Sequence, residues 1–213
     1  MVVKFLRNRL VFYKEAFRQT QEVGALSHTS KRVADAIAEP IRLARRGAPL
    51  RVLEVGAGTG ALTGAIVERL LPGDRLDIVE INPQFVKLLK EQFVTRPGGP
   101  EIHVEQHDIE ALPRDGQYDV IVSSLPLLNF APEKVRIVFD LYLNELLRPG
   151  GTLSYYDYWA KELKTFMVGG RERRRMREGL RITKEFRDRF EVRDRLIPWN
   201  VTPAIVHYLR RPE

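Results

Sequence analysis

The sequence predicts an α/β domain built on a mostly parallel sheet, and three observations support this. Residues 50–157 alternate short β-rich runs with helical stretches, the order typical of successive parallel strands. A glycine-rich turn at 56–60 joins the first strand to the first helix. After residue 190 two extended runs predict a closing antiparallel hairpin. With 213 residues the chain is long enough for one domain with a sizeable core.

The predicted elements follow in a regular order. The strands expected in the parallel part are residues 51–55, 76–80, 101–105, 118–123 and 152–156. The helices expected between them are residues 61–71, 83–94 and 132–147, the last ending at the stop signal RPGG. The hairpin is expected from 190–197 and 204–210, around the turn PWNVTP. The charge-rich stretch 171–189 has interleaved acidic residues, which indicates a solvated helix face with local ion pairs.

Composition limits the possible partners. The chain has no cysteine, so disulfides and thiolate metal sites are excluded, and its four histidines are scattered, so we expect no metal. A net charge of +7 favours a polyanionic partner, either nucleic acid or an anionic membrane surface. No apolar run approaches the ~20 residues of a transmembrane helix, and the N-terminus does not resemble a signal peptide. We therefore expect a cytoplasmic protein.

The glycine turn and three carboxylates predict the ligand. The sequence GAGTGA also satisfies the dinucleotide fingerprint, so a nicotinamide or flavin enzyme is an alternative. However, Glu54 lies two residues before Gly56, where a carboxylate attracts an ammonium and repels a pyrophosphate. Glu80, at the end of the second strand, can accept both hydroxyls of a ribose, and Asp108 can accept an adenine amine. Together they favour an adenosine with a cationic amino acid tail.

With these motifs, residues 48–210 resemble the class I S-adenosylmethionine-dependent methyltransferases. The resemblance implies a Rossmann-like, mostly parallel seven-stranded sheet with a C-terminal antiparallel hairpin, and S-adenosylmethionine as cofactor. It implies that Glu54 and the glycines line the methionine end, Glu80 holds the ribose, and Asp108 with Ile109 flanks the adenine. The full set of implied cofactor-binding residues is Glu54, Gly56, Ala57, Gly58, Gly60, Glu80, Ile81, Asp108, Ile109 and Ser124.

The stretch SSLPLLNF, residues 123–130, bears on the methyl acceptor. It nearly matches the N-L-P-Y motif of adenine methyltransferases, but Ser124 replaces the asparagine and Leu127 the aromatic. Together with VGALSHTSKRVADAI at 23–37 it resembles the soluble bacterial phospholipid N-methyltransferases, which convert phosphatidylethanolamine stepwise to phosphatidylcholine. An RNA adenine N6-methyltransferase of the rRNA dimethyltransferase type remains the alternative. A non-catalytic nucleotide-binding or membrane-binding module also remains open.

The N-terminal segment, residues 1–22, is expected to form a helix separate from the domain at 23–213. An apolar stripe runs along it, made of Val3, Leu6, Leu10, Tyr13 and Phe17. Basic residues flank that stripe, which is typical of a helix lying in an anionic membrane interface. The alternative is an ordinary helix packed on the core. The first interpretation places the protein peripherally on the inner face of the cell membrane.

Three residues are candidates for catalysis: Ser124, Asp157 and Tyr13. Ser124 lies in the loop just described, Asp157 is a carboxylate near the end of the fifth strand, and Tyr13 could close over the site. Aromatic residues around Asp157 are possible walls for a headgroup ammonium: Tyr155, Tyr156, Tyr158 and Trp159. The cluster at 171–177 could bind lipid headgroup phosphates or RNA. We expect a monomer, although the sequence leaves the oligomeric state open.

Overall fold

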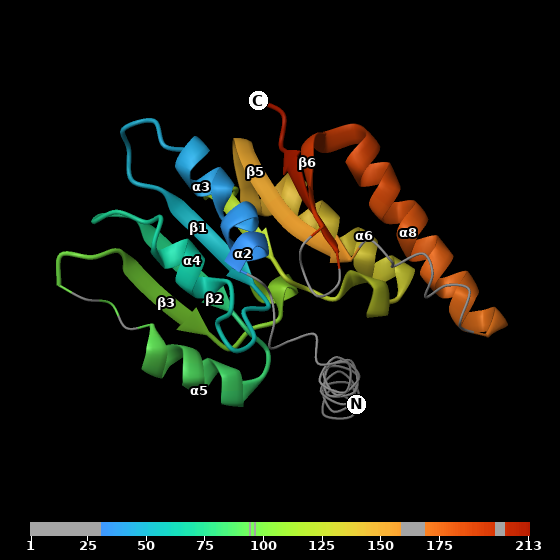
Figure 1. The fold of residues 1–213 in the computed structure, drawn as a ribbon, viewed down its shortest axis with the longest axis horizontal. Coiled ribbons are helices and arrows are strands. Elements are labelled where there is room, and N and C mark those ends of the chain that lie inside the picture. The colour runs from blue at the N-terminus through green and yellow to red at the C-terminus, as the bar shows by residue number, and fades with distance from the viewer. Residues whose placement is uncertain (1–30, 94, 96, 159–168, 199–202) are drawn as a thin grey trace.

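Seven strands form one sheet in the order β3-β2-β1-β4-β5-β7-β6, with helices on both faces (Figure 1). The computed structural model describes residues 31–93, 95, 97–158, 169–198 and 203–213. Strands β1 to β5 pair in parallel, whereas β7 pairs antiparallel with both β5 and β6. The strands are β1 Arg51–Val55, β2 Arg75–Val79, β3 Glu101–Glu105, β4 Tyr118–Ser123, β5 Leu147–Tyr158, β6 Glu191–Ile197 and β7 Ala204–Arg210.

The α-helices are shorter than expected, apart from the charged one. They are α2 Lys31–Ile37, α3 Glu39–Leu43, α4 Thr63–Val67, α5 Pro83–Gln92, α6 Pro132–Asp140 and α8 Gly170–Phe190. Two single turns, η1 Ile109–Ala111 and η2 Leu127–Asn129, follow β3 and β4, and a π-helical segment η3, Leu141–Leu146, follows α6. The predicted order of elements is thus confirmed, and the boundaries differ most in three places.

Each of these three large differences has a local backbone cause. The helix expected over 61–71 tightens after Val67, because the amides of Arg69 and Leu70 bond to carbonyls only three residues back. The helix expected over 132–147 widens into the π-helical segment η3 after Asp140. The RPGG sequence lies within β5, where Gly150 has a φ of 75° and the pairing with β4 shifts register. The periodicity of apolar residues does not distinguish a tightened helix end, a π-helical segment or an extended strand from the regular elements.

Two apolar cores lie on opposite faces of the sheet, since successive strand residues point to opposite sides. One core joins helices α2 to α5 to strand residues such as Val52 and Val120. The other joins α6, η3 and α8 to strand residues such as Leu53 and Ile121. Because both faces are covered, the central strands are apolar along their length, as in other parallel sheets. This double layer fixes the strand ends that carry the candidate site.

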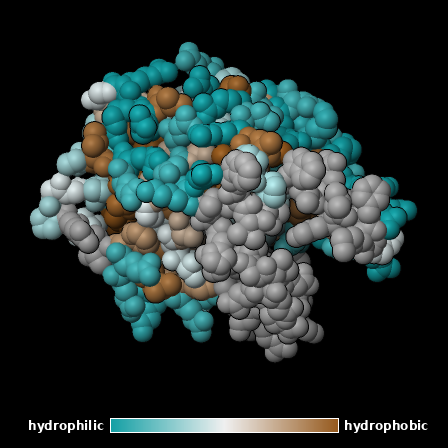
Figure 2. Space-filling view, viewed as in Figure 1, coloured by the Kyte–Doolittle hydropathy of each residue, from teal (hydrophilic) through white to brown (hydrophobic). Residues whose placement is uncertain are grey.

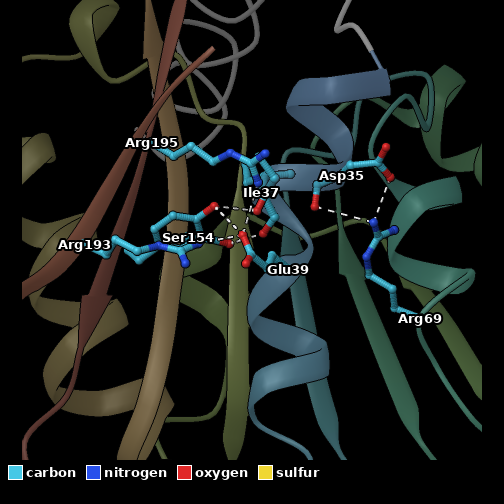
Figure 3. A network of polar contacts seen from close by, with 9 residues as sticks. Asp35, Ile37, Glu39, Arg69, Ser154, Arg193 and Arg195 are labelled. Atoms are coloured by element: carbon cyan, nitrogen blue, oxygen red, sulfur yellow. Dashed lines mark hydrogen bonds and ion pairs between the residues drawn. The ribbon is translucent and has the colours of Figure 1, made fainter.

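Polar contacts fasten α2 across the sheet (Figure 3). The Ser154 hydroxyl of β5 donates to the carbonyl of Ile37 at 2.6 Å, and the Tyr208 hydroxyl of β7 donates to that of Ala36 at 2.7 Å. These two bonds satisfy carbonyls at the end of α2 that the helix itself leaves unpaired. Ion pairs from Asp35 to Arg69 and from Glu39 to Arg193 and Arg195 extend the network to both sides.

Helix α8 confirms the expected solvated face with local ion pairs. Exposed pairs along it include Arg181 with Glu178 and Glu185, and Lys184 with Asp188. Its other face packs on α6 and the sheet through Met176, Ile182, Phe186 and Phe190. None of the helices that the structure describes combines the length and the apolar composition needed to cross a bilayer.

Candidate functional site at the carboxyl edge of the parallel strands

Most of the candidate residues lie at one edge of the sheet. Strands β1 to β4 end side by side, and β5 ends beside β4, because all five run in the same direction. The glycine turn follows β1, Glu80 follows β2, Asp108 follows β3, Ser124 follows β4 and Asp157 lies near the end of β5. In open α/β sheets this edge is where ligands bind. Tyr13 and Trp159 lie outside the described residues.

The glycine turn leaves an open face at Gly58. Gly56 has a φ of 74° and contacts the loop after β4 so closely that an added Cβ would lie 2.9 Å from Leu125 Cδ2. Gly58 has a φ of 58°, and a Cβ there would meet no atom within 4 Å. Positive φ angles of this kind favour glycine strongly. The turn therefore packs on its protein side and presents bare backbone on the other, as a closely bound ligand requires.

Glu54 is a buried carboxylate with one oxygen available. Its side chain is fully shielded from solvent, and Oε2 accepts a hydrogen bond from the Thr63 hydroxyl at 2.8 Å. Its Oε1 has no hydrogen-bond partner in the part of the chain that the structure describes. Burial raises the pKa of Glu54 to about 8, and the nearby Glu80 contributes in the same direction. An orphaned buried carboxyl oxygen fits the ammonium end of the predicted cofactor.

Glu80 joins the glycine turn to the end of β2. Its Oε2 accepts the amide of Gly58 at 2.9 Å, and its Oε1 accepts the amide of Asn82 at 2.8 Å. A carboxylate oxygen can accept more than one hydrogen bond, so both oxygens keep capacity for further donors. The carbonyl of the next residue, Ile81, accepts a hydrogen bond from Gln106 Nε2 at 3.4 Å. This arrangement is compatible with the predicted ribose contact.

Asp108 caps the turn η1 and forms an ion pair with a residue that the sequence did not suggest. Its Oδ1 accepts the amide of Glu110 at 3.1 Å and lies 3.2 Å from Lys134 Nζ. Lys134, at the start of α6, also contacts Glu110. Ile109 is buried in the core on the α6 side. The predicted adenine-flanking pair therefore lies between β3 and α6, with Lys134 as its cationic neighbour.

The loop SSLPLLNF ties β4 to the glycine turn. The amide of Ser124 donates to Val55 O at 3.1 Å, and its hydroxyl donates to Gly56 O at 2.5 Å. Behind it, the Tyr142 hydroxyl of η3 donates to Ser123 Oγ at 2.8 Å. Leu127 is 7% exposed and packs in the core. The loop is thus held by hydrogen bonds on two sides.

Asp157 lies beside a buried histidine. His207 of β7 is 2% exposed, and its Nε2 lies 3.7 Å from Asp157 Oδ2, while its Nδ1 lies 2.5 Å from Glu191 Oε1. Arg187 Nη1 of α8 lies 3.3 Å from the same Nε2. Burial lowers the pKa of His207, with its acidic neighbours opposing that effect. Asp157 therefore belongs to a cluster of charged side chains centred on His207.

The three described tyrosines at the end of β5 separate by strand alternation. Tyr155 is buried in the α6 and α8 core, where its ring stacks on His207 at a centroid distance of 5.0 Å. Tyr156 and Tyr158 pack against the opposite core as an edge-to-face pair, 5.7 Å apart. Tyr155 is therefore a core residue, while the other two are half-buried.

Sequence patterns missed several residues that support this edge: Thr63, Lys134, Tyr142 and His207. Thr63 lies in the first turn after the glycine motif, nine residues after Glu54. This short separation in the sequence was the signal that could have indicated their contact. The others come from elements far along the chain, where periodicity does not specify pairing. Among the described side chains, no three His, Asp or Glu residues gather as a metal-ligand group.

Comparisons with known proteins agree with this geometry. Residues 52–151 match the family model described as a methyltransferase domain. An ornithine lipid N-methyltransferase from Singulisphaera acidiphila is 35% identical over 106 residues, 48% of this chain and 55% of that protein. A tRNA1(Val) (adenine(37)-N6)-methyltransferase from Yersinia pestis is 36% identical over 84 residues, 38% of this chain and 33% of that protein. The matched region thus spans about half or less of these relatives.

Solved structures share the fold. The N-methyltransferase NodS from Bradyrhizobium japonicum, in complex with S-adenosylhomocysteine, has a TM-score of 0.63 and 18% identity, covering 86% of this chain and 88% of that one. The 1,6-didemethyltoxoflavin-N1-methyltransferase from Burkholderia thailandensis, bound to S-adenosylhomocysteine, has a TM-score of 0.61 and 18% identity over 97% and 90% of the two chains. The predicted fold class is confirmed. The S-adenosylhomocysteine bound in these two structures agrees with the predicted cofactor.

Proposed function

We propose that the chain carries a class I S-adenosylmethionine-dependent methyltransferase domain and that it methylates the amine of a membrane phospholipid. The acceptor we propose is phosphatidylethanolamine, with its mono- and dimethyl forms, on the path to phosphatidylcholine. The protein would act from the cytoplasm, bound peripherally to the inner face of the cell membrane. The ornithine lipid N-methyltransferase among its relatives supports a lipid amine as acceptor.

The observation that carries this proposal is the loop SSLPLLNF. An extruded adenine needs a stacking ring and a polar side chain for its exocyclic amine. Leu127 has no ring and is packed in the core, and the Ser124 hydroxyl already donates to Gly56 O. A small aliphatic amine needs neither feature. It needs a short apolar channel and an acceptor for its proton, both of which this edge can provide.

The residues of the edge have separable roles in this chemistry. S-adenosylmethionine supplies an electrophilic methyl group on a sulfonium. Glu54 would pair with its ammonium and Glu80 with its ribose, which fixes the direction in which an acceptor must approach. Asp157 would attract the lipid ammonium or take its proton, since an amine must lose a proton to become the methylated product. Little further acid–base machinery is required.

The second candidate is methylation of adenine in RNA. The tRNA adenine methyltransferase among the relatives and the net charge of +7 favour it. The absence of a ring at position 127 argues against it, as does the Ser124 hydroxyl at the position where the adenine motif has an amide side chain.

A direct assay distinguishes the two. The full chain is incubated with labelled S-adenosylmethionine and one of three acceptors: vesicles of phosphatidylethanolamine with phosphatidylglycerol, the same vesicles with ornithine lipid replacing phosphatidylethanolamine, or total RNA. We expect label in mono-, di- and trimethylated phosphatidylethanolamine. Label in ornithine lipid alone would correct the acceptor, and label in RNA alone would overturn the lipid proposal.

Asp157 provides the matched test of the acceptor site. D157N keeps the shape of the side chain but removes its charge, so we expect a lower rate of lipid methylation with unchanged affinity for S-adenosylhomocysteine. D115N, an exposed aspartate before β4, is the control and should have the wild-type rate. Loss of cofactor affinity in D157N would show that the residue supports the fold rather than the acceptor.

A further inference from the structure

Helix α8 extends beyond the sheet at the edge that holds the candidate site. It ends at Phe190, where β6 begins beside Leu209 at the C-terminal end of β7, and that end lies at the amino edge of the parallel strands. Helix α8 therefore runs antiparallel to these strands and starts at their carboxyl edge. A helix of 21 residues is about 31 Å long, whereas a five-residue strand spans about 17 Å. Figure 1 shows its first turns projecting past the strand ends.

The projecting part of α8 is fastened to the acceptor loop. Arg175 Nη1 donates to the carbonyl of Phe130, the last residue of SSLPLLNF, at 2.5 Å. Arg175 also forms an ion pair with Glu172, so its charge is partly satisfied within the helix. Met176 is buried on the same side. The first turns of α8 therefore have a fixed position relative to the loop after β4.

The opposite side of these turns presents cations without counter-charges. Arg171, Arg174 and Arg177 are exposed, and their spacing of three residues places them on one face of the helix. They form no ion pair with any residue that the structure describes, and we call them the α8 arginine stripe. The same region is hydrophilic in Figure 2, at the right-hand projection. Like charges at this spacing destabilise a helix, so the stability of α8 does not explain the presence of these three arginines.

The second half of α8 provides an internal comparison. Two of its outward cations, Arg181 and Lys184, are paired with Glu178, Glu185 and Asp188, and a third, Arg189, lies over the Phe190 ring. Residues 171–177 contain five arginines and one glutamate. Unneutralised positive charge is thus concentrated in the half of the helix that lies beside the candidate site.

We infer that the α8 arginine stripe is a docking surface for an anionic phospholipid bilayer, which it holds against the carboxyl edge of the sheet. This rests on the proposed lipid acceptor, because only a membrane-bound acceptor requires the edge to face a bilayer. The stripe is a convex row of cations on a projecting helix, which suits a broad anionic surface. Residues 170–181 contain no aromatic side chain, whereas single-stranded RNA is bound by stacking on aromatic rings as well as by charge.

The contribution of the stripe is measurable. Each cation close to an anionic bilayer strengthens binding by about fivefold, so three together contribute at most about a hundredfold at low ionic strength. The test compares the full chain with R171Q/R174Q/R177Q and with the matched control R136Q/R181Q/K184Q. The control removes three cations that are ion-paired on the same side of the molecule. Sedimentation with vesicles of phosphatidylethanolamine and phosphatidylglycerol measures binding.

We expect the stripe variant to bind these vesicles at least tenfold more weakly and the control variant to lose less than threefold. Both variants should keep wild-type melting temperature and affinity for S-adenosylhomocysteine. Equal losses in the two variants would show a dependence on net charge alone, and no loss in the stripe variant would show that α8 does not dock; either result overturns the inference. So would a loss of binding to RNA with unchanged vesicle binding.

A separate readout distinguishes failure of this inference from failure of the proposed function. Methylation of phosphatidylethanolamine in neutral detergent micelles does not require an anionic surface. If the wild type methylates the lipid there while the stripe variant binds anionic vesicles normally, the function stands and the docking surface is wrong. If the wild type methylates no lipid in either system, the proposed function fails.

Discussion

At the scale of single residues, Glu54 combines a buried position with an incomplete set of partners. Thr63 satisfies one carboxyl oxygen, and burial raises the pKa of the group to about 8. Glu54 is therefore mostly protonated near pH 7 in the ligand-free protein. A ligand that brings an ammonium favours the carboxylate, so binding of that ligand should release a proton.

This predicts a pH-dependent affinity for S-adenosylhomocysteine. Between pH 6 and 7.5 an α-amino group remains mainly charged, while Glu54 must lose its proton to pair with it. We expect the affinity to rise with pH by up to about tenfold per pH unit. Calorimetry at pH 6, 6.75 and 7.5 measures this, and E54Q should bind more weakly with a flat profile. A wild-type profile without slope would contradict the prediction.

The same group affects the stability of the ligand-free protein, with a definite sign. The unfolded chain releases the Glu54 proton near pH 4.5, whereas the folded protein keeps it until about pH 8. The contribution of Glu54 to the free energy of unfolding is therefore largest below pH 4.5 and falls as the pH rises from there to about 8. It then stays constant, so E54Q should remove this part of the pH dependence.

Glu80 should be needed for cofactor binding through two effects. E80A removes the predicted ribose contact and leaves the amides of Gly58 and Asn82 without their acceptor. Each lost bond of this kind costs about 1–3 kcal/mol. We expect affinity for S-adenosylhomocysteine to fall by at least tenfold, measured by calorimetry. E105A, at the exposed end of β3, is the matched control, and an equal loss there would remove the specific role of Glu80.

Sequence patterns located these carboxylates because each follows a strand directly. A glycine turn or a strand end specifies a position on the sheet edge within one residue, so Glu54, Glu80 and Asp108 could be assigned to that edge in advance. Lys134 could not, because its contact with Asp108 spans 26 residues between two elements. The hydrogen bond from the Ser124 hydroxyl to Gly56 O also requires that β1 and β4 are neighbours in the sheet. Sequence spacing alone does not show that pairing.

At the scale of elements, α2 depends on two hydroxyls of other strands. S154A and Y208F each leave a buried carbonyl of α2 without its donor. We expect each to lower the free energy of unfolding by about 1–3 kcal/mol, as thermal unfolding would show. S124A also deletes a hydroxyl bond, but to a partly exposed loop, and serves as the comparison. Unchanged melting temperatures for both would show that α2 is held by apolar packing alone.

Element order could be predicted more fully than element ends. Continuous apolar runs predicted β1 and β4 with their observed bounds, since both are buried parallel strands. Alternation of polar and apolar residues predicted the bounds of β3, the exposed edge strand. The extended β5 and the π-helical segment η3 could not be predicted, because both depend on register with β4 and on packing of Tyr142. The membrane-interface helix predicted for 1–22 lies outside the described residues and stays a prediction.

At the scale of the whole molecule, the dependence of vesicle binding on salt concentration should distinguish two kinds of membrane binding. Apolar residues of the segment 1–22 would bind in a manner insensitive to ionic strength, whereas the α8 arginine stripe would bind electrostatically. Deleting residues 1–20 should remove the part of vesicle binding that persists in ~0.5 M salt, where the Debye length is only a few ångströms. Affinity for S-adenosylhomocysteine should remain unchanged, which provides the control for folding. Undiminished binding in high salt would contradict the interfacial helix.

The position of β7 has a consequence for the order in which the molecule can be made. This strand is the last of the seven to be translated, yet it lies between β5 and β6 and pairs with both. On the ribosome, five parallel strands can assemble while β5 still has an open edge and β6 has no neighbour. A nascent chain stalled after residue 203 should therefore stay sensitive to protease, and one stalled well beyond residue 213 by a linker should become resistant.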